Sequence, residues 1–469
     1  MTFKHGLLSV LVVVGIGWEV VAGPGVVQLQ SAQPPIQVPA PKQRLFPGGP
    51  DVAVAGASVS LSDTLRAQMA ATVDTVDAHL RRMAPSGRPP ALVQGRLVRR
   101  PCRLGMACET LRRPESYALL IEADTVQVVG ADEKGLVHGL TQLAVQARQG
   151  GGLLAPGRIL DHPDHATRAL HFVLRNVTVA EARRLVVMAR RAQMNTLIVQ
   201  VADGLRLPSM ADLARGDAWS PQEWRTFVRY ARQNGLTLIP EIKALTHQEK
   251  LFARSRPDLL YNAETYDPRN PAVYTRVFAM IDDLIDATNP PAVHIGHDEL
   301  AGATIHPNIP REEQLPAGQG PLPPDLFLRD IQTLHTYLQG RGVETWMWGD
   351  MLVGPHEFPD MASPALHAPP AYAALRPSVP DDVVICDWHY FGAQADFPTA
   401  RAFVDAGHEV LGATWKNKRT TERFSRVVAG LPRGGRGMIA TTWFHVQRDE
   451  WRTVAGIVEL SGAAFWTMQ

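Results

Sequence analysis

The stretch Ala292-Val-His-Ile-Gly-His-Asp-Glu-Leu300 governs the interpretation of this chain. Val293 and Ile295 suit a buried strand, and two adjacent carboxylates, Asp298 and Glu299, follow where that strand would end. In a parallel α/β barrel, side chains at the C-terminal ends of the strands face the active site. The pattern therefore predicts two acids that face a substrate. A solvated acidic loop is the competing interpretation.

Seven further apolar runs recur along the chain and alternate with amphipathic stretches. Strands that alternate with helices indicate parallel βαβ units, and about eight such units in roughly 300 residues predict a (β/α)8 TIM barrel. A doubly wound open sheet is the alternative, but no glycine-rich phosphate fingerprint follows the first strand. The eight predicted strands are Ala169–Leu174, Asn195–Val201, Leu236–Ile242, Ala292–Gly296, Glu344–Trp348, Val383–Trp388, Glu409–Trp415 and Gly437–Trp443.

Three segments precede the barrel. Lys4, the apolar run Leu7–Ile16 and small residues up to Ala22 form a signal peptide pattern, so we expect a secreted or periplasmic protein. An uncleaved anchor is the alternative. A segment rich in Pro, Gly and Gln follows, and then helical and β-like runs that predict a small α/β domain. The predicted bounds are 1–22 for the signal peptide, 23–50 for the linker, 51–157 for the small domain and 158–469 for the barrel.

Composition excludes several classes of partner. The 469 residues contain 47 Lys and Arg against 46 Asp and Glu, which gives no indication of nucleic-acid binding. No helix-length apolar run follows the N-terminus, so we expect no stable membrane insertion after cleavage. No Cys/His spacing resembles a zinc site, and we expect neither metal nor cofactor. Cys102 and Cys108 are close enough in sequence to form a disulfide, whereas Cys386 is expected to be a buried thiol.

Aromatic and polar side chains recur at the predicted C-terminal strand ends. Aromatic rings stack on the C–H face of a sugar, while acidic and other polar groups bind its hydroxyls. Carboxylates in such a pocket indicate cleavage of a glycosidic bond. The aromatic candidates are Trp346, Trp348, Trp388, Tyr390, Trp415 and Trp443.

The adjacency of the two acids constrains the mechanism. Neighbouring α-carbons are about 3.8 Å apart, whereas paired glycosidase carboxyls flank the scissile bond at about 5 Å or about 6.5–9.5 Å. Asp298 and Glu299 would therefore approach the substrate from one side. The nucleophile is then either another carboxylate, such as Glu241 or Asp203, or the substrate's own acetamido group.

The barrel resembles glycoside hydrolase family 20, the β-N-acetylhexosaminidases. His294–Glu299 is similar to the family's His-x-Gly-Gly-Asp-Glu signature, and Asn234–Ile242, with His247 beyond it, resembles the family's Gly-Ile-x-x-Ile-Pro-Glu-Ile stretch. Asp267–Pro271 resembles the segment before the helix that leads into the signature strand, and Lys134–Leu140 resembles part of the family's small non-catalytic domain. The similarity is strong over the first half of the barrel and weak over the second.

The resemblance implies exo-acting, substrate-assisted retaining hydrolysis of terminal N-acetylglucosamine or N-acetylgalactosamine. Glu299 would be the general acid/base, and Asp298 would orient the acetamido group. Asp203 and His247 would form a polar chain that supports Glu299. The substrate-binding residues would be Arg168, His294, Trp346, Trp348, Trp388, Tyr390, Trp415 and Trp443.

Three positions depart from the family pattern. His297 replaces a glycine beside the acids, where an imidazole is expected to tune their pKa. Lys243 replaces the acid that normally follows Pro-Glu-Ile, and His445 stands where a sugar-binding Glu is usual. Two alternatives therefore accompany the main hypothesis: a glycosidase of this fold that acts on another sugar through a separate carboxylate nucleophile, and a non-catalytic carbohydrate-binding protein.

Overall fold

The computed structural model describes residues 37–84, 87–98, 107–306, 308–361, 365–392 and 396–467. The predicted signal peptide and Cys102 lie outside these ranges, and nothing is described for the side chain of Cys108. Cys386 is buried, as predicted. None of the helices in these ranges combines the length and the hydropathy that a membrane span needs.

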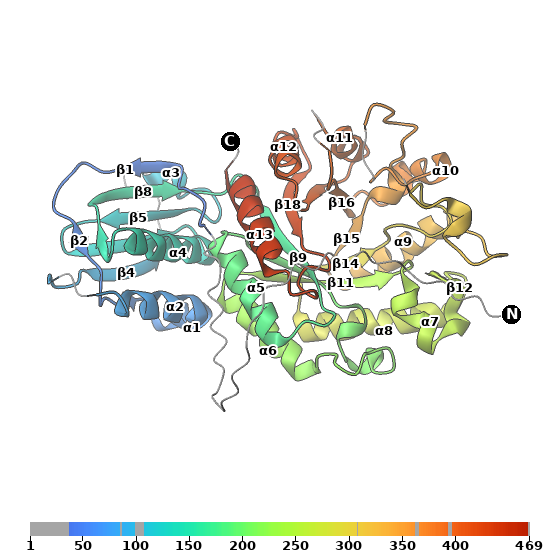
Figure 1. The fold of residues 1–469 in the computed structure, drawn as a ribbon, viewed down its shortest axis with the longest axis horizontal. Helices are drawn as coiled ribbons and strands as arrows, with labels where there is room; N and C mark the ends of the chain where they lie inside the picture. Colours follow the sequence, from blue (N-terminus) through green and yellow to red (C-terminus); the bar gives the residue numbers. More distant parts are fainter. Residues whose placement is uncertain are drawn as a thin grey trace, which may run out of the picture. The chain divides into compact units, whose positions relative to one another are not determined.

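Eight parallel strands close into a barrel, which confirms the predicted (β/α)8 fold (Figure 1). The strands follow one another around the barrel in sequence order, because each βαβ unit places its second strand beside its first. The strands are β9 Thr167–Val173, β10 Thr196–Gln200, β11 Thr237–Ala244, β14 Ala292–Gly296, β15 Glu344–Trp348, β16 Val384–Trp388, β17 Val410–Thr414 and β18 Gly435–Thr441.

Local sequence signals explain where the barrel helices begin. Thr178 and Ser220 cap the helices that follow them, and a Glu three residues later completes a capping box in each case. The longer helices are α5 Val179–Arg191, α6 Pro221–Gln233, α8 Pro271–Thr288, α9 Pro324–Gln339, α11 Pro398–Asp405, α12 Lys418–Ala429 and α13 Trp451–Trp466. Shorter elements in the connections are α7 Phe252–Ser255, β12 Leu260–Asn262, β13 Thr265–Tyr266 and α10 Pro370–Ala373.

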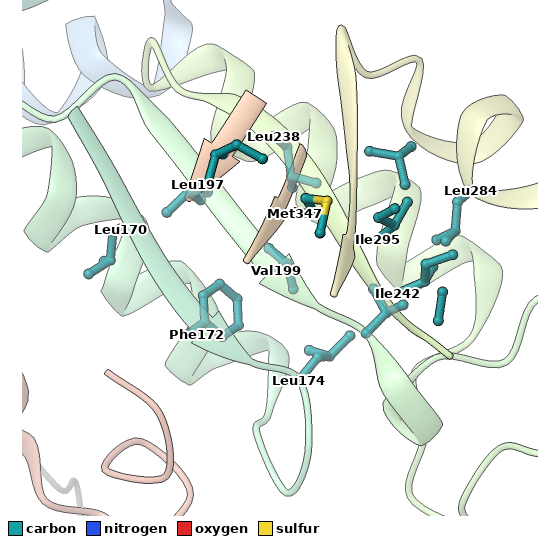
Figure 2. Packing of buried hydrophobic residues seen from close by; sticks show 14 of the residues in the cluster. Leu170, Phe172, Leu174, Leu197, Val199, Leu238, Ile242, Leu284, Ile295 and Met347 are labelled. Atoms are coloured by element: carbon teal, nitrogen blue, oxygen red, sulfur yellow. The ribbon is translucent and has the colours of Figure 1, made fainter. Parts of the chain in front are cut away.

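Alternation along each strand separates two layers of side chains. On β11, Ile239 packs with the apolar residues of the barrel interior, and Glu241 and Lys243 share its parity. Leu238 and Ile242 belong to the larger core between the strands and the helices. Figure 2 shows part of this outer core, with labelled side chains on β9, β10, β11, β14 and β15 and Leu284 on α8.

The small α/β domain is built on a six-stranded sheet with the order β1-β8-β5-β6-β4-β3. Two helices, α2 and α4, pack apolar side chains against it. The sheet extends beyond the predicted bounds of 51–157, since β1 lies within the predicted linker and β8 ends at Asp161. The elements are β1 Gln43–Leu45, β2 Val52–Ala53, β3 Val59–Ser60, α1 Asp63–Gln68, α2 Ala70–Arg81, β4 Leu92–Leu97, α3 Ala107–Thr110, β5 Tyr117–Ile121, β6 Thr125–Gly130, α4 Glu133–Gln149, β7 Leu153–Leu154 and β8 Gly157–Asp161.

Arg168 connects the barrel to the small domain. It is fully buried near the N-terminal end of β9, and its parity directs it away from the barrel interior. Its guanidinium group donates to Glu115 Oε2 at 2.5 Å and to the carbonyl oxygens of Gln193 at 2.9 Å and His165 at 2.7 Å. This position corrects the prediction that Arg168 binds sugar hydroxyls, because the C-terminal strand ends are at the opposite end of the barrel.

We predict that Arg168→Met destabilises the fold by about 3–5 kcal/mol, because removing one partner of a buried ion pair leaves the other charge unpaired. Burial would raise the pKa of Glu115, but Arg168, His138 and Lys134 hold it well below its usual range. Urea unfolding near neutral pH measures the loss, with Arg311→Met at an exposed position as the control. A raised KM with unchanged stability would instead support a role for Arg168 in sugar binding.

Candidate active site

A cavity of about 430 Å³ opens at the C-terminal ends of the barrel strands. Five of the predicted aromatic residues line it, and this size is within the range of small-molecule sites. The rings of Trp388 and Tyr390 stack with their centroids 4.7 Å apart, and those of Trp348 and Trp443 are 5.8 Å apart. With Trp415, they give the cavity the flat apolar faces on which a sugar ring stacks.

Trp346 and His294 lie outside the lining, which corrects two predicted substrate contacts. Trp346 faces the interior two residues before Trp348, so it lies deeper in the barrel, where its Nε1 donates to Glu344 at 3.1 Å. His294 is fully buried, with its ring 4.7 Å from that of Trp348. Burial lowers the pKa of His294 to about 4, so its imidazole is neutral at neutral pH. Both side chains are buried in the barrel interior, where they pack beneath the residues that line the cavity.

The two acids follow β14 in a sharply bent segment. Gly296, His297 and Glu299 have positive φ values of 81°, 70° and 51°. Such left-handed conformations are costly for non-glycine residues and cluster at functional sites. Asp298 and Glu299 both line the cavity, and their side chains are 9% and 43% exposed. Asp298 is therefore enclosed, whereas Glu299 is accessible.

Lys243 holds the Asp298 carboxylate. Its Nζ donates to both oxygens of Asp298 at 3.0 Å and lies 3.6 Å from Oε1 of Glu241. Burial would lower the pKa of Lys243, but these two carboxylates raise it above its ordinary value. Burial would raise the pKa of Asp298, but Lys243 and His247 hold it well below its usual range. Asp298 is thus ionised and paired with an ammonium group.

His247 lies between the two acids, and Asp203 does not. The Nε2 atom of His247 is 3.3 Å from Oδ2 of Asp298 and 3.8 Å from Oε2 of Glu299. Asp203 follows β10, and its carboxylate pairs with Arg254 at 2.7 Å and Arg175 at 3.6 Å. In the described part of the chain, the predicted polar chain from Asp203 through His247 to Glu299 is therefore not formed, because two arginines take up the Asp203 carboxylate.

Arg175, Asp350 and His367 are among the residues of the cavity neighbourhood that the sequence prediction did not assign to the site. Arg175, just beyond β9, lines the cavity that Arg168 was expected to line, and strand parity would have identified it. Asp350 Oδ2 accepts a hydrogen bond from the backbone N–H of Glu299 at 2.9 Å and lies 2.9 Å from Nδ1 of His367. Asp350 could have been predicted, because it comes just after the end of a predicted strand. His367 could not, because it lies in a connection without a periodic pattern.

The two unusual histidines face away from the acids. The Nε2 atom of His297 lies 2.9 Å from Oδ2 of Asp330 on α9, so this side chain anchors the bent segment to a helix. The Nδ1 atom of His445 lies 2.5 Å from Oε2 of Glu450, and its ring stacks on Trp415. Among the contacts of the described residues, none joins the His297 imidazole to the Glu299 carboxyl group, which we expected to be neighbours.

Three side chains offer ligand atoms that a cation would need. One atom each from His247, Asp298 and Glu299 lies within 4.8 Å of the others. However, the ammonium group of Lys243 already binds both oxygens of Asp298. Lys243 thus supplies the positive charge that balances these carboxylates, and we assign no metal to His247, Asp298 and Glu299.

Residues 189–414 match the family model of the glycosyl hydrolase family 20 catalytic domain. This range extends from α5 to β17 and contains both acids, Lys243 and His247. The match covers just under half of the 469 residues, and over this segment the chain is similar to the catalytic domain of glycosyl hydrolase family 20, a family of glycosidases.

The comparisons with individual proteins agree with this similarity. The lacto-N-biosidase of Bifidobacterium bifidum is 23% identical over 254 residues, which cover 51% of this chain but only 22% of that protein. A β-hexosaminidase variant of Streptomyces plicatus in complex with product GlcNAc aligns with a TM-score of 0.64 at 17% identity, over 93% of this chain and 91% of that one. An exo β-N-acetylglucosaminidase of Vibrio harveyi in complex with N-acetylglucosamine aligns with a TM-score of 0.65 at 16% identity, over 92% and 73%. These structural similarities establish a shared fold.

We predict that the stabilising effect of His367 decreases as the pH rises. Burial would lower the pKa of His367, but Asp350 raises it above its ordinary value. A raised folded-state pKa contributes stability that is complete below the unfolded pKa of about 6.5 and is lost as the pH rises through the folded-state value. The unfolding free energy of the wild type should therefore exceed that of His367→Gln by more at about pH 5.5 than at about pH 8.5.

Asp350→Asn provides the matched comparison for this prediction, because the amide cannot act as the anionic partner of the imidazolium. It should lose the same pH-dependent part of the stability. Equal destabilisation by His367→Gln at both pH values would show that the pair does not contain a charged imidazole in the folded protein.

Proposed function

We propose that the protein is an exo-acting β-N-acetylhexosaminidase that removes terminal N-acetylglucosamine or N-acetylgalactosamine by substrate-assisted retaining catalysis. The observation that carries this proposal is the set of acids in the cavity. Among the described residues, Asp298 and Glu299 are the only carboxylates that line it. They are adjacent in the chain, so no carboxylate from another strand is placed to attack an anomeric carbon that is bound there. The substrate's acetamido oxygen then remains as the nucleophile.

The two carboxylates considered as separate nucleophiles are engaged elsewhere. Glu241 is fully buried, with Nε2 of His171 at 2.9 Å and the side-chain amide of Gln200 donating at 2.8 Å. Asp203 does not line the cavity, and its carboxylate is paired with Arg254 and Arg175. This arrangement argues against a same-fold glycosidase with its own carboxylate nucleophile. The accessible Glu299 beside a buried, ionised acid also argues against a protein that only binds carbohydrate.

The residues have distinct roles in the proposed reaction. Glu299 transfers a proton to the glycosidic oxygen as the bond from that oxygen to the anomeric carbon breaks. The acetamido oxygen forms the new bond to this carbon, and Asp298 accepts a hydrogen bond from the acetamido N–H while it stabilises the positive charge. Glu299, now ionised, takes a proton from the water that opens the cyclic intermediate. Two displacements at one carbon retain its configuration.

The surroundings of the reaction fit a carbohydrate substrate. Trp348, Trp388, Tyr390, Trp415 and Trp443 would enclose the terminal sugar. The similarity to proteins named β-hexosaminidase and exo β-N-acetylglucosaminidase supports the choice of sugar and the exo mode of action. We also propose that the chain is exported to the periplasm or the medium, on the signal peptide pattern of residues 1–22.

We predict that Glu299→Gln lowers turnover of substrates with poor leaving groups by about 100- to 10,000-fold, the usual contribution of a general acid. Activated aryl glycosides need less protonation of the leaving oxygen, so their turnover should fall much less. Steady-state kinetics on nitrophenyl and methylphenyl N-acetylglucosaminides measures the difference. Equal losses on the two substrates would contradict the acid role.

We predict that Asp298→Asn lowers kcat about 100-fold or more, because a preorganised charge-assisted contact strengthens in the transition state. The amide keeps the size of the side chain and removes its charge, so KM should change less than kcat. A thiazoline analogue of the cyclised intermediate should inhibit the wild type strongly and the variant weakly. Wild-type hydrolysis of glycosides without the 2-acetamido group at comparable rates, with no thiazoline inhibition, would overturn the proposed mechanism.

A further inference from the structure

Lys243 is a residue that the proposed reaction does not yet explain. It stands on β11 where the sequence comparison expects an acid, and it is 4% exposed at the cavity. We propose that Lys243 is a positioning residue that fixes the orientation and the charge of Asp298, and that it acts through Asp298 instead of touching the sugar. This inference rests on the proposed function, because it concerns the acid that would hold the acetamido group.

The hydrogen bonds of Lys243 leave little of its ammonium group for a substrate. An ammonium group has three protons to donate. Two bonds of 3.0 Å reach the two oxygens of Asp298, and Oε1 of Glu241 lies 3.6 Å away on the same strand. Asp298 therefore uses two of the three protons, and Glu241 lies within ion-pair distance of the same ammonium group, which is why we assign Lys243 to Asp298 and not to the sugar.

The same contacts define how Asp298 meets its substrate. A carboxylate has about four acceptor positions, two on each oxygen. Lys243 uses one position on each oxygen, and Nε2 of His247 lies 3.3 Å from Oδ2. Among the described neighbours, this leaves the second position of Oδ1 for an incoming N–H. Because Lys243 binds both oxygens, the Asp298 carboxylate cannot rotate freely. The free acceptor position of Oδ1 therefore keeps a constant direction.

Lys243 is itself held in place from the barrel interior. Glu241 is fixed by His171 and by Gln200, and the side-chain amide of Gln248 donates to the carbonyl oxygen of Lys243 at 2.7 Å. The side chain cannot move away without removing the cation that lies between two buried carboxylates, which is energetically costly. Asp298 is thus connected through one ammonium group to a rigid interior network.

Replacement of Lys243 by a neutral residue changes the charge of this group. Two buried carboxylates without a cation between them favour uptake of a proton by one of them. A protonated or rotated Asp298 loses the charged acceptor that the acetamido N–H needs. The other titratable groups near this cluster include His171, His247, His294, Glu299, Asp350, His367, Cys386 and Tyr390.

A double-mutant cycle tests whether Lys243 acts through Asp298. We expect Lys243→Met to lower kcat for an aryl N-acetylglucosaminide about tenfold or more, with a smaller change in KM, since residues in direct contact are energetically coupled. In the Asp298→Asn background, the same substitution should cause little further loss. Lys418→Met, at a side chain that is 74% exposed, is the matched control and should behave as the wild type. Additive losses in the cycle would overturn the inference.

Chemical rescue separates the charge of Lys243 from its volume. In Lys243→Ala, added propylammonium can occupy the space of the missing side chain, and we expect it to restore part of kcat. Propanol of similar size should not. Equal rescue by both compounds, or by neither while the variant remains folded by circular dichroism, would show that the lysine only fills space.

The outcomes distinguish this inference from the proposed function on which it rests. A wild type without turnover of N-acetylglucosaminides and without thiazoline inhibition would overturn both. A wild type with both properties, in a cycle without coupling between Lys243 and Asp298, would overturn the role of Lys243 alone. Strong coupling together with rescue by the ammonium compound only would establish it.

Discussion

Two carboxylates, Glu241 and Asp298, are buried near one end of the barrel, and the ammonium group of Lys243 lies between them. A buried charge without a partner costs several kcal/mol, so the three side chains are stable only as a group. This requirement ties the end of β11 to the bent segment after β14. That segment carries Glu299, so the position of the accessible acid depends on a charge pair that it does not itself form.

Closure of the barrel brings the other parts of the site together. All eight parallel strands point the same way, and their C-terminal ends meet at one rim, where aromatic residues of four strands enclose the cavity. Apolar runs were sufficient to predict every strand of the barrel. The site acids, His247 and five aromatic residues could also be predicted, because each stands at or just beyond a strand end, where barrels place functional side chains.

The residues that were wrongly predicted to contact substrate show that a position near a strand end does not by itself identify a lining residue. Arg168 lies near the N-terminal end of β9, whereas Arg175 lies just beyond the C-terminal end of this strand and lines the cavity. Trp346 and Trp348 point to the same face of β15, but Trp346 lies two residues farther from the C-terminal end of the strand, so only Trp348 lines the cavity. Direction and depth can be counted from a sequence. The contacts of Asp350 with Glu299 and His367, and of Lys243 with Asp298, join segments far apart in the chain, and no local pattern encodes them.

The left-handed backbone around the cavity has a consequence for attempts to make this protein more heat-resistant. Ala202, His247, Glu299 and Trp443 all line the cavity and all have positive φ. Glycine adopts this conformation without the penalty of a Cβ atom. A library screened only for survival at high temperature would therefore enrich glycine at Glu299 and Trp443, and the selected proteins would be more stable but would lack the proposed acid and one aromatic face of the cavity. Selection for durability in this barrel has to be coupled to a catalytic readout from the first round.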